Sequence, residues 1–436
     1  MIGKKSEWYA DFVNMEYSPN KDDIVCLFKF EAIGGVSGKE AMGRIASESS
    51  VGTWTTLAEV PKMLPKLKAN AFWRRGKFCK VAYPSILFEH GSITGFLAGP
   101  AGNIFGMKAV KSLRLVDAEL PLEYVKDFRG PTFGTDAIGK IFKKKIGPIT
   151  AVVPKPKLGY TAYQHAEKVA YAIWRGGIDC VKDDENLTNQ TFNKFSERVE
   201  HLSRVRDKAE KETGEVKEAF INVTAPDLKE LENRIKKVHD HGFRYFMLDV
   251  VISGFTAVQT AHNIAHDYGM AIHAHRAMHA MFTRNQNHGM SMLFLAKLLR
   301  LVGVDQLHVG TAVGKLEGMK NEIIATKDMI LSNQVEEITM IRLHQDWGKI
   351  KPMLPVASGG LHPGLLPYVF DIYKTTDMVV QVGGGTQGHP MGTEAGAKAV
   401  VQAIEAYHQN IDVREYAKDH AELREALKKW GFTRPK

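Results

Sequence analysis

From residue 147 to the C-terminus, one pattern repeats along the chain. A short apolar or β-branched run is followed by a polar or glycine-rich turn and then by an amphipathic helical segment. About eight such units over roughly 280 residues match a (β/α)8 TIM barrel, whereas a doubly wound sheet usually has fewer strands. The expected strands span 150–153, 178–181, 219–223, 245–251, 271–275, 306–309, 354–357 and 378–382. The expected helices span 161–174, 190–213, 227–241, 257–268, 289–301, 318–331, 365–373 and 393–408.

The N-terminal part of the chain lacks this regularity. It combines strand-like runs at 23–30 and 80–84 with a helix-like segment at 38–49. We therefore expect an α/β protein in which residues 1–130 form a small N-terminal α+β domain. Residues 131–436 are expected to form the barrel catalytic domain with a C-terminal helical tail.

The composition is that of a folded, soluble protein. Of 436 residues, 44% are hydrophobic and 25% are charged, which excludes disordered, collagenous and coiled-coil classes.

Three widely spaced cysteines with no CxxC pair favour a reducing cytoplasm over a disulfide framework or a thiolate zinc site. The N-terminus has no apolar signal segment, and apolar stretches such as 291–304 are interrupted by Lys297 and Arg300. We therefore expect neither secretion nor a membrane span.

The formal net charge is +9, from 58 Lys and Arg against 49 Asp and Glu. The positive charge is spread along the chain, and its densest run, Lys143 to Lys145, is short. A solvated basic face and a field that concentrates a small polyanionic substrate both account for it. A nucleic-acid-binding protein would place such charge on an outer face, whereas the charges that we assign to function gather at one rim of the barrel. We therefore expect no nucleic acid partner.

In a TIM barrel the active site lies at the C-terminal ends of the strands, and there the sequence places charge and glycine. Pro154 ends the first strand because proline cannot donate to a sheet ladder, so Lys155 and Lys157 lie at the barrel mouth. Their spacing of two puts both side chains on one side of an extended segment, where they could bind an anion or move a proton. A basic surface loop is the alternative.

The second strand ends in Lys182, Asp183, Asp184 and Glu185. Alternation places Lys182 and Asp184 on one face, and Glu185 follows on the loop. Two carboxylates fit a hard divalent cation such as Mg²⁺. The lysine becomes an oxygen ligand only as the carbamate that its neutral amine forms with CO₂. A surface salt-bridge cluster is the alternative.

Histidines end the fifth and sixth strands. His273 and His275 share a face, Arg276 begins the loop, and His308 closes the next strand. An imidazole at this rim suits general acid/base work because it titrates near neutrality, although single histidines are more often structural. Lys315 lies in a glycine-flanked loop that is either a mobile lid or an ordinary turn.

Glycine follows the seventh and eighth strands, as Ser358-Gly359-Gly360 and Gly383-Gly384-Gly385. Glycine lets backbone N–H groups approach an anion closely, near helix N-termini whose dipoles favour it. These two loops are the usual phosphate site of the barrel, and the basic groups across the mouth leave room for a second phosphate. Simple turns are the alternative.

Taken together, these motifs resemble the large chain of ribulose-1,5-bisphosphate carboxylase/oxygenase (RuBisCO). The likeness runs from Glu48 to the C-terminus. VPKPKLGY, the LHPG after Ser358 and the compact length are more similar to archaeal form III enzymes than to plant form I or bacterial form II chains. The strings that carry the likeness are SESSVGTWTT, GNIFGMKAV, GGIDCVKDDEN, HRAMHA, HVGTAVGKLEG, LPVASGG and QVGGGTQGHP.

The resemblance implies carboxylation of ribulose 1,5-bisphosphate by CO₂ and water to two molecules of 3-phosphoglycerate, with O₂ competing for the same enediolate. Lys182, carbamylated by an activating CO₂, would hold Mg²⁺ with Asp184 and Glu185. Lys155 and His275 would be acid/base groups, and Lys315 would polarise the incoming CO₂. Form III resemblance also suggests a role in nucleotide (AMP) salvage rather than in a Calvin cycle.

The resemblance further implies a homodimer with shared active sites, which can assemble into an oligomer of dimers. One departure from the plant pattern is Val153-Pro154, where plant chains have Thr-Ile and gain a hydroxyl contact to the substrate. The implied substrate-binding residues are Lys157, Arg276, His279, His308, Ser358, Gly359, Gly360, Gln381, Gly383 and Gly384, with Glu48, Thr53, Trp54 and Asn103 from a neighbouring subunit.

Two other enzyme classes share parts of this pattern. A RuBisCO-like enolase or isomerase of another phosphorylated sugar usually lacks some of the lysines, which are all kept here. A metal-dependent hydrolase on the same barrel has its HxH pair in the first strand and its carboxylated lysine later. Here Lys182 precedes His273, which counts against that class.

Overall fold

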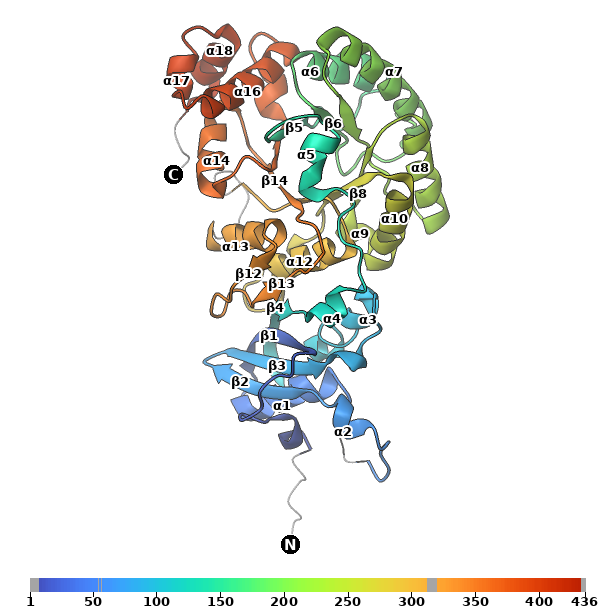
Figure 1. Ribbon diagram of the computed structural model, residues 1–436, viewed down its shortest axis with the longest axis vertical. Coiled ribbons are helices and arrows are strands. Elements are labelled where there is room, and N and C mark those ends of the chain that lie inside the picture. Colours follow the sequence, from blue (N-terminus) through green and yellow to red (C-terminus); the bar gives the residue numbers. More distant parts are fainter. Residues whose placement is uncertain (1–7, 54, 56, 312–319, 433–436) are drawn as a thin grey trace. The chain divides into compact units, whose positions relative to one another are not determined.

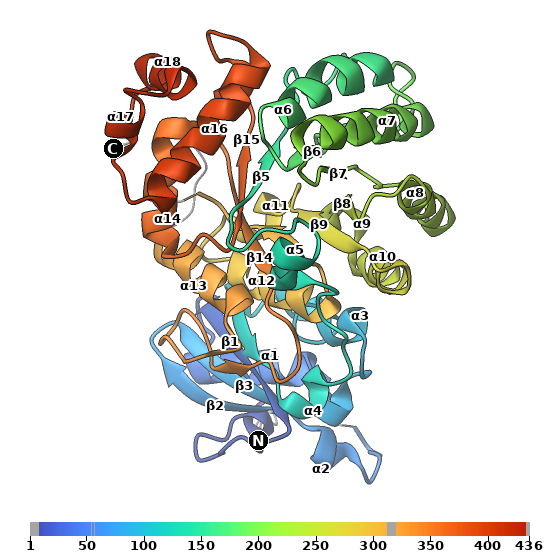
Figure 2. The same ribbon diagram turned by 45° about the horizontal axis from the view of Figure 1, so that its top comes forward.

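The computed structural model describes residues 8–53, 55, 57–311 and 320–432. The chain forms two compact units (Figures 1 and 2). The first unit contains residues 1–129, 278–302 and 332–350, and the second contains residues 130–277, 303–331 and 351–436.

The first unit is built on a five-stranded sheet in the order β10-β4-β1-β3-β2. Its pairs are antiparallel, except that β10 runs parallel to β4. The strands are β1 (Asp23–Ala32), β2 (Asn70–Arg75), β3 (Phe78–Pro84), β4 (Val110–Glu119) and β10 (Gly289–Met290), and a separate pair joins β12 (Gln334–Val335) to β13 (Gln345–Asp346). The helices are η1 (Ala10–Phe12), α1 (Gly38–Glu48), α2 (Leu64–Leu67), η2 (Ser85–Leu87), α3 (Ile93–Leu97), η3 (Asn103–Gly106), α4 (Leu122–Val125), α11 (Ala280–Thr283) and α12 (Met292–Val302).

Helix α12 corresponds to the expected helix 289–301, but it belongs to the first unit rather than to the barrel unit. The Ser291 N–H donates to the Leu115 carbonyl of β4 at 2.9 Å. Lys297 of α12 is fully buried and forms an ion pair of 2.7 Å with Asp117 of β4. A lysine charge this deep needs a buried carboxylate, so this pair ties α12 to the N-terminal sheet.

The second unit is a parallel eight-stranded barrel, as the sequence predicts. In the described part of the chain its strands follow the order β7-β6-β5-β15-β14-β11-β9-β8, and the bridge between Asn222 and Met247 joins the β7 side to β8. The strands are β5 (Ile149–Val152), β6 (Cys180–Lys182), β7 (Glu218–Phe220), β8 (Tyr245–Asp249), β9 (Ala271–His275), β11 (Gln306–His308), β14 (Leu354–Ser358) and β15 (Val379–Val382). Their ends differ from the expected ones by up to three residues.

Helices cover the outside of these strands (Figure 2). Local signals set their ends: the Asp227 carboxylate accepts from the Glu230 N–H at the start of α8, and Gly214 takes a left-handed conformation at the end of α7. The helices are η4 (Gly134–Asp136), α5 (Ala137–Lys140), η5 (Gln164–Ala170), α6 (Tyr171–Arg175), α7 (Phe195–Thr213), α8 (Leu228–Asp240), α9 (Val250–Ser253), α10 (Phe255–Tyr268), α13 (Lys320–Leu331), η6 (Pro363–Leu365), α14 (Leu366–Tyr373), α15 (Gly384–Gln387), α16 (Thr393–His408), α17 (Val413–Tyr416) and α18 (Ala421–Trp430).

Among the described residues, no helix has the length and apolar character that crossing a bilayer would need.

Candidate active site

The inward face of the barrel changes character along its strands. Side chains at alternate strand positions point the same way, so residues two apart share a face. Near the N-terminal ends these positions are apolar, and Cys180, Met247 and Val356 share one buried core with residues of α5. Two residues further along β6, β8 and β14 the same face carries Lys182, Asp249 and Ser358. The C-terminal rim of the barrel is therefore polar.

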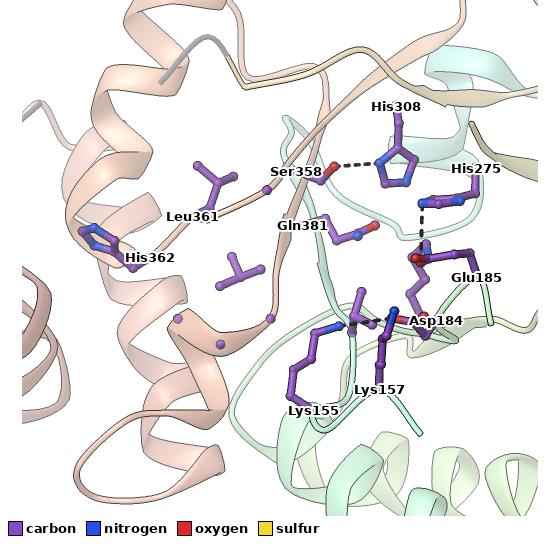
Figure 3. Close-up of a pocket in the computed structure, with 18 of the residues that line it drawn as sticks. Lys155, Lys157, Asp184, Glu185, His275, His308, Ser358, Leu361, His362 and Gln381 are labelled. Atoms are coloured by element: carbon purple, nitrogen blue, oxygen red, sulfur yellow. Dashed lines mark hydrogen bonds and ion pairs between the residues drawn. The ribbon is translucent and has the colours of Figure 1, made fainter. Parts of the chain in front are cut away.

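A cavity of about 550 Å³ opens at this rim, and all its lining residues belong to the barrel unit (Figure 3). Lys155 and Lys157 lie together at one side of it, and Ser358 and His308 lie at another. The lining residues are Val153, Lys155, Lys157, Lys182, Asp184, Glu185, His275, His308, Ser358, Gly359, Gly360, Leu361, His362, Gln381, Val382, Gly383, Gly384, Gly385 and Trp430.

Lys155 is held over the acidic cluster. Its Nζ donates to Oδ2 of Asp184 at 3.1 Å. Its backbone is fixed by Gln387, which accepts from the Lys155 N–H at 2.6 Å and donates to the Lys155 carbonyl at 2.7 Å. The Tyr160 hydroxyl donates to the same carbonyl at 2.9 Å. The first lysine of the PKPK motif thus enters the cavity from a backbone clamped on both sides.

Lys182 is almost completely buried, with 1% of its surface exposed. Its Nζ donates to the Asp183 carbonyl at 2.8 Å. Burial lowers the pKa of the Lys182 amine, although the negative charges of Asp249, Glu185 and Asp184 oppose this. A lowered pKa makes the neutral, nucleophilic amine more available than in an ordinary lysine.

Asp183 does not line the cavity and supports the strand end from behind. Its Oδ2 accepts from Arg198 Nε at 3.0 Å and from the Asn222 N–H at 3.0 Å, and its Oδ1 lies 3.2 Å from His165 Nε2. Arg198 is fully buried as well. The two adjacent aspartates therefore have different surroundings: Asp183 is paired inside the structure, and Asp184 faces the cavity.

His275 is oriented by a carboxylate. Its Nδ1 lies 2.9 Å from Oδ1 of Asp249, and its Nε2 lies 3.8 Å from Glu185. Because a carboxylate can only accept, Nδ1 carries the proton that is donated to Asp249. Nε2 is then the unprotonated nitrogen of the neutral ring, and it lies on the side of Glu185 and the cavity. Asp249 is itself held by Asn222 and Thr224, each at 3.3 Å.

Opposite the acidic cluster, Ser358 Oγ lies 2.7 Å from Nδ1 of His308. Gly359 and Gly360 follow with φ of +108° and +70°, a backbone region that side chains disfavour. A Cβ on Gly385 would lie 2.3 Å from the Leu361 carbonyl oxygen, so the two glycine loops are in direct contact. The glycines of both loops also line the cavity, where backbone without side chains suits the close approach of an anion.

The donor set at the rim fits a hard cation only in part. Asp184 and Glu185 supply two carboxylates, and no group of three or more His, Cys, Asp or Glu side chains in the described residues is arranged to hold a metal ion. Lys182 is the third group at this point; its protonated form cannot ligate, and its neutral amine nitrogen is not the oxygen ligand that a hard cation prefers. Its carbamate would add the missing anionic oxygen, so the residues fit Mg²⁺ once Lys182 is modified.

The other predicted residues lie in several places. Gln381 lines the cavity, and its buried Oε1 has no hydrogen-bond partner among the described side chains and backbone. Arg276 is not a lining residue; burial lowers its pKa to about 10. Lys315 and Trp54 lie outside the described residues. Glu48, Thr53, Asn103 and His279 belong to the first unit.

Sequence reasoning missed several residues of this site. Asp249 falls inside the expected strand 245–251, but the strand ends at Asp249, so a shorter strand would have revealed it. Gln387 lies beyond the glycine run and acts through its contact with Lys155. Trp430 comes from the last helix, α18, and no motif in its surroundings points to the barrel mouth.

Comparisons with known proteins agree with this architecture. The family model "Ribulose bisphosphate carboxylase large chain, N-terminal domain" matches residues 11–124, and the corresponding catalytic-domain model matches residues 135–430. Ribulose bisphosphate carboxylases of Pyrococcus abyssi and Archaeoglobus fulgidus are each 48% identical, over 99% and 98% of this chain and 99% of each relative. The dimeric archaeal Rubisco of Hyperthermus butylicus superimposes with a TM-score of 0.93 at 46% identity, covering 98% of this chain and 100% of that one. The octameric Rubisco of Pyrococcus horikoshii, in complex with sulfate ion, gives 0.91 at 47% identity and 98% of both chains.

Proposed function

Because the chain belongs to the ribulose bisphosphate carboxylase large-chain family, we propose that it is a carbon–carbon lyase that carboxylates ribulose 1,5-bisphosphate. CO₂ and water would convert the bisphosphate to two molecules of 3-phosphoglycerate, with O₂ as a competing substrate. The observation that carries this proposal is the gathering of Lys155, Lys182, Asp184, Glu185 and His275 around one cavity of a chain matched over its full length by named carboxylases.

Lys182, Asp184 and Glu185 are the proposed holders of Mg²⁺. The neutral Lys182 amine would attack the carbon of CO₂, forming an N–C bond and releasing one proton, and so become an anionic carbamate. Burial of Lys182 supports this, because burial favours the neutral amine against the opposing charges of the nearby carboxylates. A bound Mg²⁺ would supply positive charge that stabilises the negative charge developing on the substrate during enolisation.

Lys155 and His275 are the proposed acid/base groups for enolisation and product protonation. Lys155 Nζ reaches the acidic cluster, and the Asp249 carboxylate keeps the His275 Nε2 toward the cavity and stabilises the ring when it takes a proton. Lys315, which lies outside the described residues, is proposed to polarise CO₂.

The cavity lining combines two kinds of group that bind anions, as a sugar bisphosphate requires. The glycine loops would bind phosphate through backbone N–H groups, and the basic side chains would bind it through their charge. The proposed substrate-binding residues are Lys157, Arg276, His279, His308, Ser358, Gly359, Gly360, Gln381, Gly383 and Gly384, completed by Glu48, Thr53, Trp54 and Asn103 of the partner subunit. Dimeric and octameric relatives support a homodimer as the smallest complete assembly.

The test is fixation of radiolabelled bicarbonate into acid-stable product with ribulose 1,5-bisphosphate, with and without preincubation in CO₂ and Mg²⁺. Activity that needs preincubation and is lost in Lys182→Ala supports the carboxylase and its carbamate. Exchange of solvent protons into the bisphosphate without fixation would replace this proposal by a RuBisCO-like enolase or isomerase.

From the similarity of its motifs to those of form III chains, we also propose that this protein acts in nucleotide (AMP) salvage. In an extract of the source cells, ribose carbon from labelled AMP should reach 3-phosphoglycerate, and removal of this protein should abolish that transfer.

A further inference from the structure

A chain of hydrogen bonds runs from the cavity into the barrel interior. Ser358 Oγ lies 2.7 Å from Nδ1 of His308, and Nε2 of His308 lies 3.0 Å from Nε2 of His273 (Figure 3 shows the first contact). Nδ1 of His273 lies 2.8 Å from Oε1 of Gln306, whose amide nitrogen donates to the Tyr245 hydroxyl at 3.0 Å. Ser358 and His308 line the cavity, whereas His273, Gln306 and Tyr245 are fully buried and do not.

The orientation of Gln306 gives this chain a direction. An amide oxygen only accepts, so the proton on His273 must be on Nδ1. In a neutral imidazole the other nitrogen then accepts, and His308 must donate to it from its own Nε2. His308 Nδ1 is left as an acceptor, and the Ser358 hydroxyl donates to it.

The surroundings keep both imidazoles neutral. His273 stacks on Phe220, with ring centroids 4.3 Å apart and an interplanar angle of 11°. Burial lowers the pKa of both His273 and His308 well below the usual range. Because both rings are neutral, each has one donor and one acceptor nitrogen, and all the hydrogen bonds from Ser358 to Gln306 can run in one direction.

We propose that His273 and Gln306 are positioning residues that fix the tautomer of His308, so that Ser358 presents its oxygen to the cavity as a hydrogen-bond acceptor for a hydroxyl of the sugar bisphosphate. This inference rests on the proposed function for the class of substrate. The two positioning residues themselves do not line the cavity. The site should bind a ligand with a hydroxyl donor opposite Ser358 more tightly than a ligand that has only an acceptor there.

The direction of these hydrogen bonds can be observed without any ligand. Neutron diffraction from crystals of the wild-type protein exchanged into D₂O locates deuterium on each ring nitrogen. The expected pattern is deuterium on Nδ1 of His273 and Nε2 of His308, with none on Nδ1 of His308. Deuterium on His308 Nδ1 pointing at Ser358 would overturn the proposal.

The consequence for binding is tested by a double-mutant cycle on Gln306→Met and Ser358→Ala. The probe is ribitol 1,5-bisphosphate, an unreactive pentitol, and its Kd is measured by calorimetry. Gln306→Met should weaken binding by about two- to fivefold, the worth of one hydrogen bond whose geometry is no longer fixed. In the Ser358→Ala background the same change should have no further effect, because the hydroxyl that it orients is gone.

Gln345→Met is the matched control. Gln345 is also fully buried and bonds to the Leu120 backbone in the first unit, so it reports the general cost of losing a buried amide. Equal losses from Gln306→Met in both backgrounds would show a structural role only and refute the positioning role. Wild-type protein that fails to bind the pentitol bisphosphate would refute the proposed substrate class, while the neutron result still decides the tautomer.

Discussion

Nζ of Lys155 lies 3.1 Å from Oδ2 of Asp184, although the two residues follow different strands, β5 and β6. Parallel strands that are neighbours in the barrel bring their C-terminal ends together, and this places an amine against a carboxylate. Burial acts to raise the pKa of Asp184, but hydrogen bonds from Asn186 and the charge of Lys155 outweigh it, and the net shift is downward. Asp184 is therefore held as an anion, and its contact with the Lys155 amine lies at the centre of the site.

Lys155→Gln should remove both proton exchange and carboxylation. Without the amine, the group proposed to move a proton at this position is lost, and we expect both rates to fall by about 100-fold or more. Proton exchange is measured by incorporation of solvent deuterium into ribulose 1,5-bisphosphate, and carboxylation by radiolabel fixation. Lys168→Gln, at an exposed lysine of η5, is the control. Normal exchange in Lys155→Gln would assign proton removal to another residue.

Asp183→Asn should destabilise the barrel unit. The change leaves the fully buried Arg198 guanidinium without its anionic partner, at a cost of about 3 to 5 kcal/mol. The measurement is the free energy of unfolding in denaturant, or the thermal midpoint if unfolding is irreversible. Combining Asp183→Asn with Arg198→Met should recover part of the loss, because no buried charge then lacks a partner. A double variant that is less stable than Asp183→Asn alone would contradict this account.

Glu218 should make stability fall as pH rises. Burial raises its pKa to about 8 from the ordinary 4.5, although hydrogen bonds from the Arg244 N–H oppose the shift. The folded state therefore holds a proton that the unfolded state releases. The contribution to stability is complete below pH 4.5 and is lost as pH rises through about 8, with an upper limit of about 5 kcal/mol.

Glu218→Gln removes this titration. We expect the thermal midpoint of Glu218→Gln minus that of the wild type to be larger at pH 8 than at pH 5. Calorimetric melts at both pH values give the two differences directly. A constant difference across this range would show that Glu218 does not take up the proton.

Mixing two inactive variants should restore activity if active sites are shared between subunits. Glu48→Gln and Lys182→Ala would each inactivate every site of their own homodimer. In a heterodimer, one of the two sites combines an intact Glu48 with an intact Lys182, so a 1:1 mixture at random exchange should regain about a quarter of wild-type activity. The readout is radiolabel fixation after subunit exchange, with exchange itself confirmed by mass spectrometry of differently tagged subunits. No recovery despite confirmed exchange would contradict shared sites.

Periodicity and turn residues alone predicted the eight barrel strands and the helices between them. These are local properties: a strand of a parallel barrel is a short apolar run, and its end is marked by proline, glycine or charge. For the same reason the sequence by itself located Lys155, Lys182, Asp184, Glu185, His275 and Ser358 at one rim, where the structure gathers them around one cavity.

Only the tertiary structure decided which groups support these residues. Asp249 orients His275, Gln387 clamps the backbone of Lys155, and Trp430 closes part of the wall, each from a distant part of the chain. It also decided that α12, despite its place in the βα repeat, belongs to the first unit through the buried pair of Lys297 and Asp117. Such contacts join residues far apart in sequence, and they follow from how packed elements meet in space, which no local pattern of residues encodes.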